Sequence, residues 1–279
     1  MTSPSNTSRD GRSSAAVRPV EGSSRYRVPA AARLLAVLEL LAEARKAYGV
    51  SEISRRLEIP KSSCFALLST LEDGGYVRRN ARDEWMLTLR LYHLGVTAAQ
   101  NIDILLVAQP IVNELSDTTS MTAHLGMFDG RSIVYALKVE PPENMVKFDT
   151  YPGKKASVHL TAIGRAIAAV LDERDLARLL DGHEFTGGEN SRIRSRQSFL
   201  AELRRVRQSG VALENEEESV GVACVAAPVS YAGGAGAAAV GVTALAAQLN
   251  EQSIAEVTKA VVNAASNLSS LLGIRTGSG

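Results

Sequence analysis

The chain has 279 residues, of which 45% are hydrophobic, with 31 Lys and Arg against 30 Asp and Glu. That length exceeds a typical single domain and the apolar content suffices for folded cores, so we expect two domains. No uninterrupted apolar stretch could span a bilayer and no signal segment is visible, which excludes a membrane protein and favours the cytoplasm. The two cysteines, Cys64 and Cys224, fall in different predicted domains, which excludes a disulfide framework and a cysteine-based zinc site.

The charge is unevenly distributed along the chain. Residues 1–90 hold 15 Lys and Arg against 10 Asp and Glu, whereas the remainder holds 16 against 20. A basic N-terminal part favours contact with phosphates, although such an excess alone is common on solvated surfaces. Residues 1–26 are rich in Ser, Arg and Gly and nearly lack large apolar side chains, so they are predicted to form a disordered tail.

Two short helices joined by a tight turn are predicted between Tyr48 and Asp73, after a helix over residues 32–41. Ser51 can cap the first of the pair, and Pro60 stands where the chain turns into the second. Apolar side chains recur along that second helix at the spacing of one buried face, and these are Cys64, Leu67, Leu68 and Leu71. Its opposite face carries a cation and mostly short side chains, which let a helix approach base edges. The residues expected to contact DNA are Ser51, Lys61, Ser62, Ser63, Phe65 and Ser69.

A β-hairpin is predicted directly after these helices. Gly74 and Gly75 can end the helix, and strand patterns at residues 76–79 and 84–87 flank a turn. Such a hairpin is typical of the wing of a winged helix, here assigned to residues 27–88. We expect the wing to reach phosphates or a minor groove through Arg78, Arg79 and Arg82. The alternative is a helical hairpin and a β-hairpin that serve only for packing.

Three segments resemble the IclR-type (isocitrate lyase regulator) transcription factors. The first is the order of a helix, an "A-x-x-L-x-I-P-K-S-S" turn, a second helix, "L-x-x-G-Y" and a wing. Residues 159–166, HLTAIGRA, are similar to the family's "H-x-T-A-x-G-K-A" helix start. Residues 214–229 are similar to its "D-x-E-E-x-x-x-G-x-x-C-x-A-A-P-V" signature. The order and spread of these matches make chance agreement improbable.

The resemblance implies an α+β protein with an N-terminal winged helix-turn-helix, linker helices over residues 89–116 and a GAF-like effector-binding domain over residues 117–279. It further implies a ligand-responsive transcriptional repressor or activator that binds a pseudo-palindromic operator on double-stranded DNA as a homodimer or homotetramer. This chain departs from the family at Phe65-Ala66, where a basic residue is common, so the operator sequence cannot be transferred from relatives. Arg165 replaces a usual Lys, and Ala162-Ile163 are bulkier than in some members, which bears on the size of the ligand.

Periodicity predicts alternating strands and helices in the C-terminal part, with a turn at residues 233–236. The predicted strands cover residues 121–128, 132–139, 145–148, 222–229 and 237–245, and the predicted helices cover residues 161–171, 173–180, 196–208 and 253–272.

A small carboxylate effector is expected at the start of the helix that Thr161 can cap. The free N–H groups of Ala162, Ile163 and Gly164 would hold its oxygens. If family geometry holds, Cys224 and Thr243 on core strands line the same cavity, with Glu214 contributed by a loop. Apolar walls are expected from Met121, Met145, Leu160 and Val225. A structural Thr cap and an ordinary buried Cys are the alternative.

The sequence lacks the motifs of common enzymes. The four histidines, His93, His124, His159 and His183, show no metal-ligand spacing, and the Gly-rich turn has no phosphate-loop context. The acidic run at residues 214–218 is interpreted as a solvated face. We therefore expect no catalytic residues, metal site or cofactor. The alternative is a metabolic enzyme or small-molecule binder whose winged helix serves protein contacts.

Overall fold

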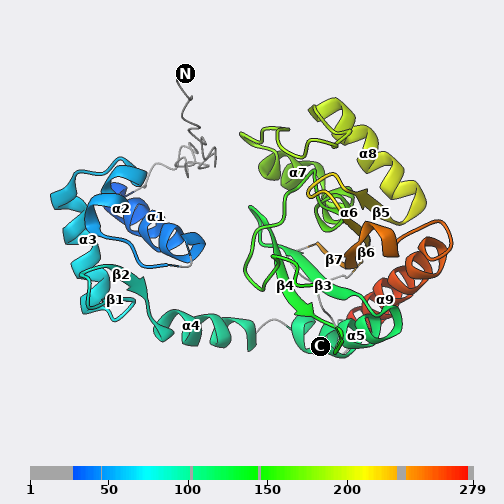
Figure 1. The fold of residues 1–279 in the computed structure, drawn as a ribbon, viewed down its shortest axis with the longest axis horizontal. Coiled ribbons are helices and arrows are strands. Elements are labelled where there is room, and N and C mark those ends of the chain that lie inside the picture. The colour runs from blue at the N-terminus through cyan, green and yellow to red at the C-terminus, as the bar shows by residue number, and fades with distance from the viewer. Residues whose placement is uncertain (1–27, 45, 101–102, 144–145, 231–236, 276–279) are drawn as a thin grey trace, which may run out of the picture. The chain divides into compact units, whose positions relative to one another are not determined.

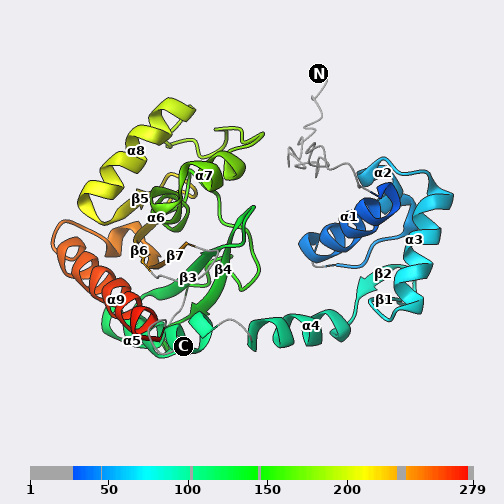
Figure 2. The ribbon, with the colours of Figure 1, turned by 180° about the vertical axis from the view of Figure 1, so that it is seen from behind.

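The protein is described from a computed structural model covering residues 28–44, 46–100, 103–143, 146–230 and 237–275. The chain forms two compact units, Met1–Asn101 and Ile102–Gly279 (Figures 1 and 2). The predicted tail, the turn at residues 233–236 and Met145 lie outside the described residues.

The first unit is a small three-helix core closed by a hairpin. Its elements are α1 (Pro29–Ala44), α2 (Val50–Leu57), α3 (Lys61–Asp73), β1 (Val77–Arg79), β2 (Trp85–Leu87) and α4 (Leu89–Gln100). Ile53 of α2 and Cys64 and Leu68 of α3 are fully buried, and they pack against α1 and against Trp85 of the hairpin. The predicted core face of the second helix is thus confirmed, except that Leu67 is only half-buried.

The start of α2 differs from the prediction, whereas the turn into α3 agrees with it. The helix begins one residue before Ser51, at Val50, and its N-cap is Gly49, which makes no side-chain cap hydrogen bond. Ser51 therefore lies inside the exposed first turn and does not cap the helix. Pro60 is the N-cap residue of α3, as its position in the sequence suggested.

The predicted linker helices are divided between the two units. Helix α4 belongs to the first unit, and α5 (Asp103–Thr119) belongs to the second. Within α5, Ala108 and Val112 are fully buried in the core of the second unit. In contrast, α4 exposes Leu89 and Tyr92.

In the second unit the described residues form one antiparallel sheet of five strands, in the order β4-β3-β7-β6-β5. The strands are β3 (Thr122–Phe128), β4 (Ile133–Val139), β5 (Ala212–Asn215), β6 (Val222–Val229) and β7 (Ala238–Leu245), and the helices are α6 (Ala162–Val170), α7 (Glu173–Leu179), α8 (Arg196–Ser209), the short η1 (Ala246–Gln248) and α9 (Ile254–Arg275).

Helices cover both faces of this sheet (Figures 1 and 2). Because side chains alternate along a strand, the inner strands β3, β6 and β7 contribute to both cores. Leu125, Val225 and Val240 pack towards α5 and α9, whereas Ala226 and Ala239 pack towards α6 and α8. The chain thus forms an N-terminal helix-turn-helix domain and a C-terminal α+β domain.

Two predictions for the second unit are wrong. Residues 146–148 are not a strand. Glu214 does not lie in a loop, because residues 212–215 form the edge strand β5, whose four residues are too few for a visible period-two pattern.

Candidate functional site

The exposed face of α3 is a surface of short polar side chains around one aromatic ring. Lys61, Ser62 and Phe65 are exposed, and Ser63 and Ser69 are half-buried. The Phe65 ring meets Trp85 edge-on, with 6.3 Å between the ring centroids. This contact joins α3 to the hairpin, so the two elements form one continuous surface that can offer hydroxyls and an apolar edge to bases.

The hairpin holds one of its three arginines in place. Arg79 pairs with Glu72 of α3 at 3.4 Å and with Asp83 at 3.3 Å, and its guanidinium lies 5.1 Å from the Trp85 ring centroid. Arg79 therefore fixes the hairpin on α3, with its charge largely compensated.

The other two hairpin arginines are exposed. Among the described residues, Arg78 and Arg82 form no ion pair, so their charges are available to an anion. The Asn80 side chain accepts hydrogen bonds from the backbone N–H groups of Arg82 and Glu84, which shapes the turn that presents Arg82.

Three of the residues expected at the effector site lie in one row across the second unit's sheet. Glu214 pairs in register with Cys224, Cys224 pairs with Thr243, and Thr243 pairs with Thr122. The Cys224 Sγ and Thr243 Oγ1 atoms are 3.4 Å apart. We call Glu214, Cys224, Thr243 and Thr122 the polar row. It lies on the α6 side of the sheet, and Glu214, Thr243 and Thr122 are buried there.

Burial keeps most groups around the polar row uncharged. It raises the pKa of the Cys224 thiol well above its usual value, and it raises the pKa of Glu214 although two backbone N–H groups donate to that carboxylate. The phenol of Tyr135 likewise has a pKa well above its usual value because of burial and nearby Cys224. The row thus offers uncharged hydrogen-bonding groups and one carboxyl group.

Sequence reasoning missed three residues near this row. His124, two residues beyond Thr122 on the same face of β3, is completely buried, and burial lowers its pKa to about 3. Its Nε2 lies 2.8 Å from Thr150 Oγ1, and its ring centroid lies 5.0 Å from that of Tyr135. Period-two alternation from Thr122 could have identified His124, whereas Tyr135 and Thr150 come from segments that only the fold brings near.

The start of α6 is built as predicted at its cap. The Thr161 hydroxyl accepts a hydrogen bond from the Gly164 N–H at 2.9 Å and donates to the Ser157 carbonyl. The Gly164 N–H is therefore not free, contrary to the prediction. Among the described residues, the N–H groups of Ala162 and Ile163 have no hydrogen-bond acceptor.

The apolar residues expected to line the effector pocket lie only partly near the start of α6 and the polar row. Met121 and Val225 face the core beneath α5 and α9, on the other side of the sheet, because each lies one position out of phase with the polar row. Leu160 packs beside Gly187 and Gly188 near the start of α6. Ile163 packs onto Gly126 of β3, so it fills space between α6 and the sheet.

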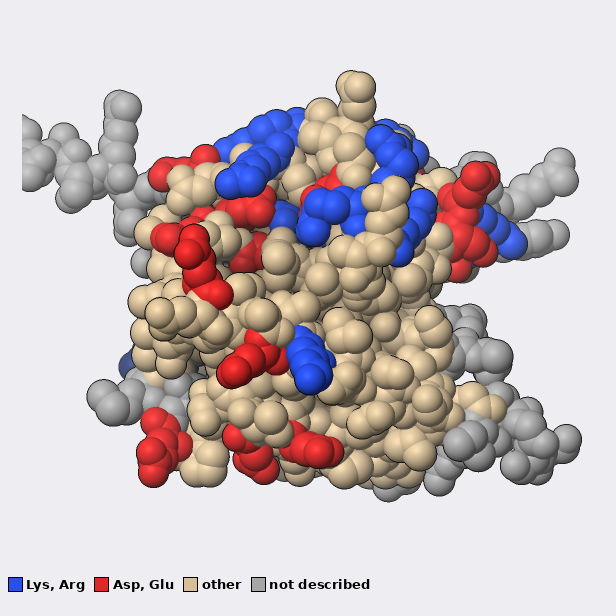
Figure 3. All heavy atoms as spheres, turned by 90° about the vertical axis from the view of Figure 1, so that its right-hand side faces the viewer, with Lys and Arg blue, Asp and Glu red and all other residues tan. Residues whose placement is uncertain are grey.

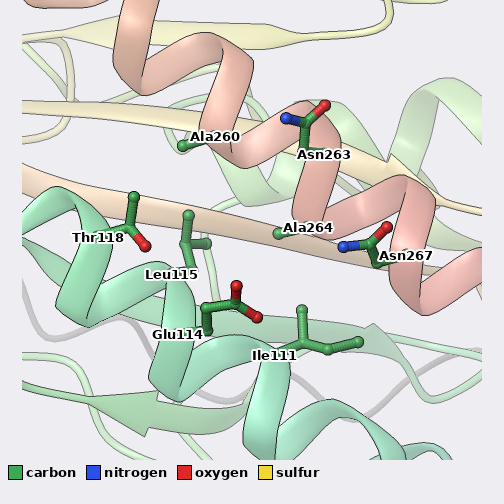
Figure 4. A pocket seen from close by; sticks show the side chains of 8 residues that line it. All are labelled: Ile111, Glu114, Leu115, Thr118, Ala260, Asn263, Ala264 and Asn267. Carbon is green, nitrogen blue, oxygen red and sulfur yellow. The ribbon is translucent and has the colours of Figure 1, made fainter.

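A groove between α5 and α9 is separate from these residues (Figure 4). It has a volume of about 190 Å³ and lies on the opposite face of the sheet from the polar row. Its lining combines small and apolar side chains with polar ones, namely Ile111, Glu114, Leu115, Thr118, Ala260, Asn263, Ala264 and Asn267. It contains none of the residues predicted to bind an effector.

The acidic run after β5 is not the solvated face we expected. Arg165 is almost fully buried and binds Glu217 through two hydrogen bonds, of 2.9 and 2.7 Å. Burial alone would raise the pKa of Glu217, but Arg165, together with hydrogen bonds from the Arg192 N–H and the Ser191 hydroxyl, outweighs burial and the pKa is lowered. The Glu214 carboxylate accepts hydrogen bonds from the N–H groups of Glu217 and Glu218. Two members of the run therefore anchor the loop to α6 and β5.

Two histidines far apart in sequence form a pair beside this anchor. His159 Nδ1 lies 3.0 Å from His183 Nε2, and both rings contact Phe185. Burial, with His183 and Arg165 nearby, lowers the pKa of His159 to about 4. Within the described ranges, no group of three or more His, Cys, Asp and Glu side chains is arranged to hold a metal ion, and no helix could cross a membrane.

Known protein families match both units. The helix-turn-helix domain of IclR matches residues 30–81, and the C-terminal domain of the bacterial transcriptional regulator IclR matches residues 96–270. The chain is 31% identical over 242 residues to the HTH-type transcriptional regulator KdgR of Escherichia coli K12, covering 86% of this chain and 91% of that protein.

Solved structures share the fold. An IclR transcriptional regulator from Alicyclobacillus acidocaldarius superposes with a TM-score of 0.74 at 26% identity, covering 89% of this chain and all of the other. An IclR homolog from Microbacterium hydrocarbonoxydans, solved with 4-hydroxybenzoate, has a TM-score of 0.72 at 17% identity, covering 87% of this chain and 98% of the other. The two matched domains, in the order winged helix and then α+β domain, place this chain in the IclR family of DNA-binding, ligand-responsive transcriptional regulators.

Proposed function

We propose that this protein binds operator DNA through α3 and the hairpin, and that a small organic acid bound in the second unit alters that binding. The observation that carries the proposal is the exposed face of short side chains on α3 beside an arginine-bearing hairpin. The family favours this function over that of an enzyme whose winged helix contacts proteins. We also propose a cytoplasmic location, where operator DNA is found.

The side chains divide into those that face bases and those that hold the backbone. Ser62, Ser63, Phe65 and Ser69 on α3 meet base edges in the major groove in this proposal. Four further side chains serve phosphates or the minor groove, and these are Ser51, Lys61, Arg78 and Arg82. Arg79 acts indirectly, since its ion pairs and its contact with Trp85 orient the hairpin.

Salt-dependent binding to the promoter of the chain's own gene tests these roles. Lys61→Ala and Arg82→Ala should each lower the salt slope by about 0.9, because each removes one phosphate contact. Arg131→Ala, an exposed arginine in the second unit, is the control with the same change in charge. If Lys61→Ala and Arg82→Ala behave like this control, the DNA-binding surface lies elsewhere.

We expect the protein to bind DNA as a homodimer or homotetramer, because a single winged helix buries too little DNA surface for specific binding. One winged helix reads a single half-site, so we expect two half-sites about 10 base pairs apart, or a multiple of that. Leu89 and Tyr92, three residues apart on α4, are 81% and 70% exposed, which supports α4 as an association surface. Leu89→Ser with Tyr92→Ser should shift sedimentation towards smaller species, and a wild-type chain that sediments as a strict monomer on DNA would contradict the assembly.

The effector is proposed to lie between the start of α6 and the polar row. The unpartnered N–H groups of Ala162 and Ile163 support a carboxylate there, with its body towards Cys224 and Thr243 and with Leu160, Thr161, Gly164 and Glu214 around it. The Microbacterium homolog illustrates that this fold can hold a small carboxylate.

A thermal-shift screen of organic acids tests the pocket. A ligand at a hundredfold excess over its Kd adds about 2.7 kcal/mol of stability. Cys224→Trp fills the proposed cavity and should abolish the shift, whereas Leu213→Trp, at a partly exposed neighbour on β5, should retain it. An unchanged shift in correctly folded Cys224→Trp would place the pocket elsewhere.

A further inference from the structure

Helix α8 concentrates positive charge on a unit that is otherwise acidic. Residues 91–279 hold 16 Lys and Arg against 20 Asp and Glu, yet α8 carries four arginines and one glutamate. Figure 3 shows Lys and Arg side chains gathered over the upper part of this face of the molecule, at the end where Figure 1 places α8.

The charges on one side of α8 are not compensated. At 100° per residue, Arg196, Arg204 and Arg207 fall on the same flank of the helix, and we call them the α8 arginine face. Glu202 lies on the opposite flank, where it pairs with Arg205 at 2.6 Å. Arg207 donates to the Ala169 carbonyl, which leaves its charge unneutralised, and Arg196 and Arg204 make no ion pair with described residues.

The chemistry of this face fits nucleic acid better than protein. Between residues 156 and 258 the cations are all arginines, whose planar guanidinium groups match phosphate oxygens in pairs. None of the exposed large apolar side chains among the described residues lies on α8. A protein interface would need such anchors at its centre, whereas protein–DNA interfaces are polar and strongly positive.

We propose that the α8 arginine face is a second DNA-contacting surface, which holds backbone phosphates of the duplex beside the operator. Arg196 and Arg204 are eight residues apart, or about 12 Å along the helix axis, so the pair can contact separate phosphates. The proposal rests on the proposed function in one respect, that the winged helix makes the first contact with the same DNA. Tethering then raises the effective concentration of the flanking duplex at α8, so weak contacts become measurable.

The length of the DNA separates the two surfaces. Wild-type full-length chain is titrated at several salt concentrations with a duplex of about 20 base pairs, which two half-sites fill, and with the same duplex extended to about 60 base pairs. The test variant is Arg196→Ala with Arg204→Ala, at two exposed positions. The control is Arg131→Ala with Lys259→Ala, which removes the same charge from other elements of this unit. Equal melting temperatures establish that both variants fold.

The test variant should bind the short duplex like wild type, and its salt slope on the long duplex should fall by about 1.8 units. The control should leave both slopes unchanged. A test variant that matches wild type on the long duplex, or that weakens on both duplexes equally, overturns the proposal. Failure of the proposed function gives a different result, since the wild-type chain would then not bind the short duplex at low salt.

Discussion

The two units build their candidate surfaces in opposite ways. The first presents neighbours in sequence, residues 61–69 and 78–82, on an exposed surface of one helix and one hairpin. The second collects Thr122, Glu214 and Thr243 from three strands that together span more than a hundred residues of sequence, and buries them. Exposed polar groups can be satisfied by water, but buried ones must satisfy one another. We therefore expect polar substitutions to alter binding in the first unit and folding in the second.

The largest contrast concerns ion pairs. Arg165→Ala should lower the free energy of unfolding by about 3 kcal/mol, because it leaves the Glu217 carboxylate, whose side chain is only 12% exposed, without its cationic partner. The exposed counterpart Arg79→Ala in the first unit should change stability far less. Urea unfolding measures both, and Arg165→Ala with Glu217→Ala should recover part of the loss. Equal costs for Arg165→Ala and Arg79→Ala would remove the contrast.

Acid should weaken the second unit through its buried histidines. The pKa of His124 is about 3 and that of His159 about 4 in the folded chain, both below the usual 6.5. Between the folded-state pKa of each histidine and 6.5, the unfolded chain binds more protons than the folded chain. The contribution of these histidines to stability is therefore fully present above pH 6.5 and is lost as the pH falls below it.

At pH 5 each of these histidines should have lowered the free energy of unfolding by about 2 kcal/mol relative to its value above pH 6.5. Glu214, whose pKa is raised, acts in the opposite direction. Unfolding of wild type and His159→Gln at pH 7.5 and pH 5 measures the effect, and His159→Gln should show a smaller loss. The same loss in both proteins would contradict this role of His159.

Replacing a glycine by alanine should also cost more stability in the second unit than in the first. A methyl group at Gly126 would overlap Ile163, a β-branched side chain that cannot easily turn away, so Gly126→Ala should cost about 1–3 kcal/mol. Gly49, the N-cap residue of α2, has open space around its Cα, so the control Gly49→Ala should cost only the change of cap residue, less than about 1 kcal/mol. Thermal melts compare the two, and a neutral Gly126→Ala would mean that α6 can lift from the sheet.

The smallest predicted effect concerns helix caps. Thr161→Ala should cost about 1 kcal/mol, because the hydroxyl accepts from the Gly164 N–H. Ser51→Ala should change stability by less than about 0.5 kcal/mol, because Ser51 caps nothing. Chemical denaturation distinguishes these values. A cost at Ser51 equal to that at Thr161 would restore the cap that the sequence suggested.

The first unit could be predicted from the sequence almost completely. The spacing of Cys64, Leu68 and Leu71 and the turn at Pro60 are local signals, and the helices and hairpin follow them closely. What failed there was a cap, which lies two residues earlier, at Gly49, so that Ser51 loses its expected capping role. The compensation of Arg79 by Glu72 was also missed, because the pair joins two elements.

In the second unit the sequence by itself determined most strands and helices, the Thr161 cap and three members of the polar row. Tertiary structure alone decided which buried polar groups meet. The pairing of His159 with His183, the burial of Arg165 against Glu217 and the approach of Tyr135 to Cys224 join distant segments. Periodicity reports which face of an element is buried, but the partners across that face depend on strand order and register, which are set by packing of the whole sheet.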